Sequence, residues 1–343
     1  MIATFDSPLR QAIMIKKLKR NLGRSLPLVA FIGVLSLGAS LMYSPADATG
    51  QRSTAEASSR LPQYQSPYQV FERNLRPVSL TKVESTFTAP EVRAALRSEI
   101  AYVQDLQSSH VLYQKNSEQV RPIASITKLM TALVVVEAGQ DMSEMLEITT
   151  ADIDRLKNST SRLHVGSKLS RADMLHLALM SSENRAANAL GRHYPGGLNA
   201  FVRAMNDKAR AIGMRQSRFV EPTGLSADNV STPQDLVKLL QATSRHKLIH
   251  QYTTSEHYAV APARGRQLQF NNTNRLVLND KWNIQISKTG FINEAGECLV
   301  MLTEIEGRKV AIVLLNSHGR YSRIGDAVRL RDLVESKQLL TML

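Results

Sequence analysis

The sequence predicts an α/β (α+β) fold in which an antiparallel sheet flanked by helices carries an inserted all-helical lobe. Two strand-like runs, residues 100–104 and 110–114, come first. Residues 122–243 then show mostly helical periods, and residues 284–315 return to the strand period before a final amphipathic helix. Because strands lie at both ends of this region, we expect them to join one sheet, with a cleft where the helical lobe meets it.

The N-terminal 89 residues are expected to lie outside this fold. A basic cluster between Lys16 and Arg24 precedes an uncharged, mostly apolar run, Leu26–Tyr43, and the small-residue pattern Ala46-Asp47-Ala48. This order predicts a secretory signal peptide over residues 1–48. The alternative is an uncleaved membrane anchor, since the apolar run is near the shortest length that spans a bilayer. Both interpretations predict export, and the periplasm is the expected location.

Residues 49–89 are rich in Ser, Gln, Pro and Arg and show no sustained period, which predicts a linker. Residues 90–343 are expected to form one compact domain. With 43% hydrophobic residues, the chain can bury a substantial core. Its single cysteine, Cys298, excludes an internal disulfide and lies in a strand-like apolar run, so we interpret it as a core residue.

The formal net charge of +13 does not indicate a nucleic-acid-binding protein, because the basic residues are scattered without interleaved aromatic residues. For an exported protein, anionic polymers of the cell envelope are the more plausible environment. The eight histidines include no His-Glu-x-x-His pattern, which disfavours a zinc peptidase. We expect neither a metal nor another cofactor.

Residue patterns typical of helix starts and helix ends divide the helical lobe into separate helices. The first helix is expected to begin near Pro122 and to end near Gly139. Ser170, followed three residues later by Asp173, predicts a capped helix start. Thr232, followed by Pro233 and Asp235, predicts another. The remaining helices are expected over residues 185–194 and 198–212, and short extended pieces are expected over residues 146–150 and 162–166.

The C-terminal strands are expected over residues 284–288, 298–305 and 309–315, with a hairpin turn at Glu306-Gly307. Apolar residues between Ile324 and Val334 then repeat with a helical period. We expect this last helix to pack on the sheet.

A Ser-x-x-Lys motif opens the first helix of the lobe. Ser125 and Lys128 are three residues apart, so a helix would place them on one face, where a neutral amine can accept the serine proton. The same spacing occurs at Ser79 and at Ser244. Ser79 is followed by no periodic helix, and Ser244 lies at the polar end of one, so Ser125 is the candidate nucleophile.

Two further motifs accompany this pair. Ser182-Glu183-Asn184 falls where a helical pattern is interrupted, so its polar groups can face a cleft. Lys288-Thr289-Gly290 is expected to end a strand, where the glycine allows a close approach of backbone to ligand. Each motif alone fits an ordinary loop serine or strand-end lysine. All three in this order point to a single site.

The set Ser-x-x-Lys, Ser-x-Asn and Lys-Thr-Gly resembles that of the penicillin-binding proteins and serine β-lactamases. Longer stretches, residues 122–132, 179–187 and 287–298, are similar to the low-molecular-mass D-alanyl-D-alanine peptidases, and most of all to endopeptidases of the penicillin-binding protein 7 type. The resemblance covers about residue 99 to the C-terminus. It implies a β-lactamase/D,D-peptidase-like fold and an enzyme that needs no metal.

The resemblance also implies the residue roles. Ser125 would be the acylated nucleophile, Lys128 its general base, and Ser182 a proton relay to the leaving amine. The expected substrate-binding residues are Asn184, Lys288, Thr289, Gly290 and Phe291. The backbone N–H groups of Ser125 and Phe291 would form the oxyanion hole. Burial or a nearby cation, for which Lys288 is the candidate, would lower the pKa of Lys128.

The implied function is a periplasmic serine D,D-endopeptidase that hydrolyses D-alanine–diaminopimelate cross-links. Its partners would be peptidoglycan stem peptides, with β-lactam antibiotics as acylating inhibitors. A class A β-lactamase is disfavoured, because the Glu221-Pro-Thr-Gly224 turn does not match the segment that drives deacylation in those enzymes. A D-alanyl-D-alanine carboxypeptidase and a non-hydrolytic penicillin-binding sensor are the alternatives. The short segment after Gly290 favours the endopeptidase over carboxypeptidases that continue into a second β domain.

Overall fold

The computed structural model describes residues 89–262 and 266–341, all within one unit, Leu80–Leu343. The predicted signal peptide, linker and apolar run, and Ser79, therefore lie outside the described residues. None of the helices in the described ranges is long and apolar enough to span a bilayer.

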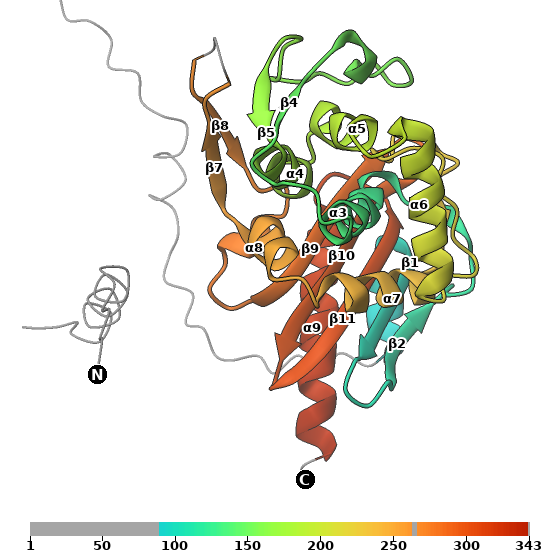
Figure 1. Ribbon diagram of the computed structural model, residues 1–343. Helices are drawn as coiled ribbons and strands as arrows, with labels where there is room; N and C mark the ends of the chain where they lie inside the picture. The colour runs from blue at the N-terminus through green and yellow to red at the C-terminus, as the bar shows by residue number, and fades with distance from the viewer. Residues whose placement is uncertain (1–88, 263–265, 342–343) are drawn as a thin grey trace, which may run out of the picture. The chain divides into compact units, whose positions relative to one another are not determined.

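A five-stranded antiparallel sheet forms the centre of the described unit, with the strand order β2-β1-β11-β10-β9 (Figure 1). The first and last strands of the chain are adjacent in it, with Val103 opposite Ile312. This confirms the expectation that N- and C-terminal strands share one sheet. Its strands are β1 (Ser98–Asp105), β2 (Val111–Lys115), β9 (Asn283–Ile292), β10 (Gly296–Ile305) and β11 (Arg308–Ser317).

Both faces of this sheet are covered, which explains why its central strands are almost continuously apolar. In β11, Ile312 and Leu314 face a core formed with α2 (Ala89–Ala95) and α9 (Ser322–Thr341). The alternate residues Val313 and Leu315 face the larger core that the helical lobe shares with the sheet. The predicted packing of the last helix on the sheet is confirmed.

The segment between β2 and β9 forms the helical lobe (Figure 1). Its helices are α3 (Thr127–Glu137), α4 (Arg171–Met180), α5 (Asn184–Arg192), α6 (Gly197–Ala211), α7 (Pro233–Thr243) and α8 (Lys247–Thr254). Three short 3₁₀ helices are η2 (Ala124–Ile126), η3 (Thr150–Asp152) and η4 (Arg275–Leu278). The small antiparallel pairs are β3 (Arg121–Pro122) with β6 (Val230–Ser231), β4 (Met145–Glu147) with β5 (Lys168–Ser170), and β7 (His257–Val260) with β8 (Leu268–Asn271).

Both predicted helix caps are present. The Ser170 side chain accepts a hydrogen bond from the backbone N–H of Asp173, and the Asp173 side chain completes the capping box. The Thr232 side chain accepts from the N–H of Asp235, with Pro233 at the first helical position.

Two predictions about extended structure are wrong. Residues 162–166 form bends and a turn, and the strand that pairs with β4 is Lys168–Ser170. The Lys288-Thr289-Gly290 triplet does not end a strand, because β9 continues to Ile292. Gly290 stays in the ladder opposite Cys298, so pairing with β10 overrides the local weakness of a glycine.

Candidate active site

Ser125 lies in the short η2 helix, which leads directly into α3. Ala124, just before it, has a left-handed backbone with φ of +46°, a conformation that costs energy in a non-glycine residue. Backbone from two other segments packs directly against this turn. A Cβ added to Gly224 would lie 1.9 Å from the Ala124 carbonyl oxygen, and one added to Gly290 would lie 3.1 Å from the Ser125 nitrogen. Two glycines therefore permit the close packing that fixes the serine.

The Lys128 amine lies beside the Ser125 hydroxyl, as the i,i+3 spacing predicts. Its Nζ atom is 2.9 Å from Ser125 Oγ, 2.7 Å from Asn184 Oδ1 and 2.6 Å from the Thr223 carbonyl oxygen. A charged ammonium donates to all three oxygens. A neutral amine keeps two N–H donors, which the amide and carbonyl oxygens can accept, and its lone pair can then face the serine hydroxyl. The site thus orients the amine as a base.

Burial lowers the pKa of Lys128, as a role as general base requires. The Lys128 side chain is 0% exposed, and this burial lowers its pKa to about 8. The carboxylates of Glu221, Glu183 and Asp154 oppose the shift and raise the pKa. Burial, rather than a neighbouring cation, is the main cause.

The Ser182-Glu183-Asn184 motif joins α4 to α5, as the interrupted pattern predicts. Ser182 has φ of +62°, a second left-handed residue at the site. Asn184 is the first residue of α5, and besides accepting from Lys128 it donates from Nδ2 to Ser159 Oγ at 2.9 Å. Glu183, to which the sequence assigns no role, is the N-cap of α5.

Lys288 comes from β9, a strand at the edge of the main sheet. Its Nζ atom donates to Ser182 Oγ at 2.9 Å and to the Thr289 carbonyl oxygen at 3.0 Å. Burial lowers its pKa well below the ordinary value, and the charges of Lys128 and Arg323 lower it further. Ser182 is thereby linked to a buried amine of its own.

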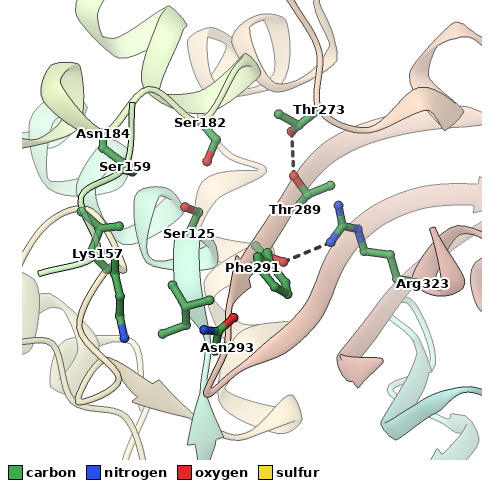
Figure 2. Close-up of a pocket in the computed structure, with 13 residues that line it drawn as sticks. Ser125, Lys157, Ser159, Ser182, Asn184, Thr273, Thr289, Phe291, Asn293 and Arg323 are labelled. Atoms are coloured by element: carbon green, nitrogen blue, oxygen red, sulfur yellow. Dashed lines mark hydrogen bonds between the residues drawn. The ribbon is translucent and has the colours of Figure 1, made fainter. Parts of the chain in front are cut away.

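An open cleft of about 470 Å³ gives access to these groups (Figure 2). Ser125, Ser182, Asn184, Thr289, Gly290 and Phe291 of the predicted site line it. Lys128 and Lys288 lie behind the lining, within hydrogen-bond distance of the two serines. Phe291 is 57% exposed at the cleft. The structure therefore brings all eight predicted residues together, although their individual roles stay predictions.

Several lining residues carry no sequence motif: Lys157, Ser159, Leu225, Thr273, Ile292, Asn293 and Arg323. Thr273 Oγ1 accepts a hydrogen bond from Thr289 Oγ1 at 2.7 Å. Arg323, from the first turn of α9, donates to the Gly290 carbonyl oxygen at 3.1 Å (Figure 2). It also forms an ion pair with Glu297. Burial lowers the pKa of its guanidinium to about 10, so it remains cationic at neutral pH. It can attract an anion at the Thr289 side of the cleft.

The turn at Glu221 also belongs to the site. Its carboxylate accepts hydrogen bonds from the backbone N–H groups of Thr223 and Gly224, at 2.6 Å each, and from the Asn229 amide. This turn supplies both the Thr223 carbonyl that contacts Lys128 and the Gly224 backbone that packs on Ala124. The sequence predicts a turn at Glu221-Pro-Thr-Gly224 but does not indicate that this turn lies at the site.

Ser244 and Cys298 have structural roles. Ser244 is the C-cap of α7 and donates its hydroxyl to the Gln241 carbonyl oxygen, whereas Lys247 begins α8. This second Ser-x-x-Lys is therefore structural. Cys298 is 0% exposed in the core, as predicted, and burial raises the pKa of its thiol to about 12.

The arrangement can perform acyl transfer. It has a partly exposed serine with a buried amine beside it, and a second serine–lysine pair across the cleft. The Arg323 guanidinium lies at the Thr289 side of the cleft, where an acidic group of a ligand could bind. Within the described residues, no group of three or more His, Cys, Asp or Glu side chains is arranged to hold a metal ion.

Comparisons with known proteins agree with this chemistry. The chain is 47% identical to the D-alanyl-D-alanine endopeptidase of Escherichia coli (strain K12) over 264 residues, which are 77% of this chain and 84% of that protein. It is also 47% identical to the Pseudomonas aeruginosa protein of the same name over 267 residues, 76% of this chain and 86% of that one.

Solved structures show the same fold. The Streptomyces K15 DD-transpeptidase superposes with a TM-score of 0.65 at 24% identity, over 71% of this chain and 98% of that one. Penicillin-binding protein D2 of Listeria monocytogenes, in its ampicillin-bound form, gives a TM-score of 0.60 at 28% identity, over 70% and 97% of the two chains. The predicted β-lactamase/D,D-peptidase-like fold is confirmed.

The family model described as D-alanyl-D-alanine carboxypeptidase, peptidase S11, matches residues 84–319. That range contains Ser125 with Lys128, the Ser182 motif and the Lys288 triplet, the three parts of the site. The protein therefore belongs to the serine D-alanyl-D-alanine peptidases of family S11.

Proposed function

We propose that the protein is a periplasmic serine D,D-endopeptidase that hydrolyses D-alanine–diaminopimelate cross-links in peptidoglycan through an acyl-serine intermediate. The observation that carries the mechanism is the contact of a buried, neutralisable Lys128 amine with Ser125 Oγ at 2.9 Å. The two relatives at 47% identity, both named endopeptidases, support the choice of substrate bond.

In the first half-reaction, Lys128 accepts the hydroxyl proton while Ser125 Oγ attacks the D-alanine carbonyl carbon. The oxyanion that forms would be held by the backbone N–H groups of Ser125 and Phe291. The C–N bond then breaks, and the leaving amine of diaminopimelate receives a proton through Ser182. Water attacks the resulting ester, which releases the D-alanine carboxylate and restores Ser125.

The carboxylate next to the leaving amine would bind at the Thr289 side of the cleft. The Arg323 guanidinium is a donor there, and Thr289 Oγ1 becomes a second one when its hydroxyl turns away from Thr273 Oγ1. Lys288 would act through Ser182, since the residue is 1% exposed and its amine donates a hydrogen bond to that hydroxyl. Asn184 would hold Lys128 and offer its amide to a substrate carbonyl.

β-Lactam antibiotics should acylate Ser125. The Listeria relative, whose structure is described as ampicillin-bound, supports this proposal. The signal peptide predicted over residues 1–48 would export the protein, and a periplasmic location would place it with the proposed substrate, which lies outside the cytoplasmic membrane.

The test uses the purified protein, its Ser125→Ala variant and a matched Ser244→Ala variant, which changes the serine of the other Ser-x-x-Lys. Each is incubated with a purified 4→3 cross-linked muropeptide dimer and, separately, with a pentapeptide monomer, and product masses are followed. We expect conversion of the dimer to monomers by the wild type and by Ser244→Ala, and none by Ser125→Ala. Loss of one alanine from the pentapeptide with an intact dimer would identify a carboxypeptidase instead. Cleavage of neither, with Ser125 still acylated by penicillin, would support the sensor.

A further inference from the structure

A cationic side chain lies on each side of the nucleophile. Among the described residues that line the cleft, Lys157 and Arg323 are the two that carry positive charge. Figure 2 shows them on opposite sides of Ser125. Arg323 is bonded to Gly290 and Glu297 near the Thr289 side, whereas Lys157 comes from the loop between η3 and β5.

Lys157, which lines the cleft, forms an ion pair at the edge of the cleft with Glu294, the neighbour of the lining residue Asn293. Its Nζ atom lies 2.5 Å from Glu294 Oε1, and Glu294 belongs to the turn between β9 and β10. The pair therefore connects the helical lobe to the sheet beside the cleft. The two side chains are 32% and 43% exposed, and an ion pair that is this accessible contributes little stability. A ligand that satisfies both charges can replace it at small cost.

The loop that carries Lys157 is held in place without this pair. Asp154 accepts hydrogen bonds from the backbone N–H groups of Leu156 at 2.8 Å, Lys157 at 3.0 Å and Ser159 at 2.8 Å. Ser159 in turn accepts from Asn184, which contacts the catalytic amine. The position of Lys157 relative to Ser125 is thus set by the loop backbone.

The direction of the substrate follows from the proposed function, on which this inference rests. If the carboxylate on the leaving side binds near Arg323, the acyl side of the peptide passes Ser125 and runs toward Lys157 and Glu294. The residue before the scissile D-alanine is the acyl-donor diaminopimelate. Its free end carries an ammonium and a carboxylate on one carbon, a pair of charges complementary to an exposed lysine–glutamate pair.

We propose that the Lys157–Glu294 pair is a specificity site for the acyl-donor strand, which binds the free amino-acid end of diaminopimelate. Lys157 receives its carboxylate and Glu294 receives its ammonium. The charges of Lys157 and Glu294 and those of the ligand's carboxylate and ammonium then alternate in sign, so each charge has an opposite neighbour. A donor strand with lysine at this position offers only the ammonium, and a diaminopimelate with an amidated carboxylate likewise loses the contact with Lys157.

The experiment compares three synthetic cross-linked peptide dimers with the same acceptor strand. Their donor strands carry diaminopimelate, its carboxamide or lysine at the residue before D-alanine. We expect the wild-type kcat/KM for diaminopimelate to exceed the other two by roughly five- to tenfold, the size of one charge-assisted contact at an accessible site. Acylation of Ser125 by a fluorescent penicillin gives the concentration of intact active sites in each protein. The measured rates are divided by this concentration.

Lys157→Met should remove the discrimination between diaminopimelate and its carboxamide. Glu294→Gln should reduce the kcat/KM for every donor with a free amine and should leave the preference for the carboxylate. The matched control is Lys168→Gln, which removes the lysine of another exposed pair, with Glu147, and should behave like the wild type.

Equal cleavage of all three dimers by the wild type would overturn this inference and leave the proposed endopeptidase intact. Discrimination that persists in Lys157→Met would also overturn it. Cleavage of none of the dimers would overturn the proposed function, and this inference with it.

Discussion

Glu221 shows how one side chain can serve a site that it does not line. Its carboxylate accepts from the Thr223 and Gly224 backbone and so holds the carbonyl that Lys128 contacts. Its charge also raises the pKa of Lys128, in opposition to burial. A buried base therefore has a nearby carboxylate that keeps its pKa from falling further.

The Glu221→Gln substitution tests this role. The proposed role of Lys128 as general base requires its neutral form, so the wild-type rate of acylation should rise with pH and level off above about 8. Removal of the carboxylate lowers the pKa of Lys128, so the acid limb should move to lower pH. The amide also leaves at least one backbone donor unpaired, at a cost of about 1–3 kcal/mol in the free energy of unfolding.

The measurement is the pH dependence of acylation by a chromogenic β-lactam, with Glu256→Gln, at an exposed glutamate, as the control. An unchanged acid limb in Glu221→Gln would show that the carboxylate acts only as a scaffold for the turn.

At the scale of elements, the site depends on how closely the 221–224 turn packs on η2. A methyl group on Gly224 would overlap the Ala124 carbonyl, and the glycine also has φ of +83°. The Gly224→Ala substitution should therefore displace Ser125 or the turn. A displacement on the order of 1 Å can reduce the rate about 100-fold, and we expect a loss of at least this size in the rate of acylation.

Gly139→Ala is the matched control for backbone strain. Gly139 has φ of +63°, but an added Cβ would meet nothing within 4 Å. This variant should lose some thermal stability and keep its acylation rate. Equal acylation rates in the two alanine variants would contradict the packing argument.

Elements with local signals could be predicted from the sequence, and elements set by packing could not. The helix starts at Ser170 and Thr232 carry their caps within three residues. By contrast, α8 (Lys247–Thr254) and the β7–β8 hairpin were missed. The α8 sequence is short and mixed in character, and its helix depends on tertiary contacts, with Ile249 buried in the core.

In the site as well, residues in local motifs could be predicted from the sequence, and residues placed by tertiary packing could not. Each of the three motifs spans only three or four consecutive residues, so the sequence shows them directly. Lys157 and Arg323 reach the cleft from a loop and from α9, and no local pattern marks either residue. The sequence left burial and the nearby cation Lys288 as alternative causes of a lowered Lys128 pKa, and only the assembled core shows that burial is the main cause.

On the scale of the whole molecule, the large core contains a titratable group away from the cleft. His176 is 6% exposed and stacks on Tyr252 and Tyr258, with ring centroids 4.2 and 3.9 Å away. Burial lowers its pKa from 6.5 to about 4, while Asp173 raises it. Between these values the unfolded chain binds a proton that the folded chain does not.

The stability should therefore fall as the pH decreases from 6.5 to about 4, and this contribution is fully present above 6.5. Its size is on the order of 2–3 kcal/mol in the free energy of unfolding. His176→Phe retains an aromatic ring for stacking and should show a flatter pH dependence in denaturant titrations at pH 4 and pH 7. Parallel pH profiles for the two proteins would refute the assignment to His176.

The pairing of β1 with β11 has a consequence for when the active site forms. β1 pairs with β11, and Ser98 donates its N–H to Asp326 in α9, 228 positions further along the chain. Such distant pairing forms late, since a long loop must close first. Ser125 and Lys128 emerge early in synthesis, but the amine beside Ser182 arrives only with β9. A nascent chain therefore holds a dormant nucleophile, and we expect hydrolytic competence only when nearly the whole polypeptide has been synthesised and the sheet has closed.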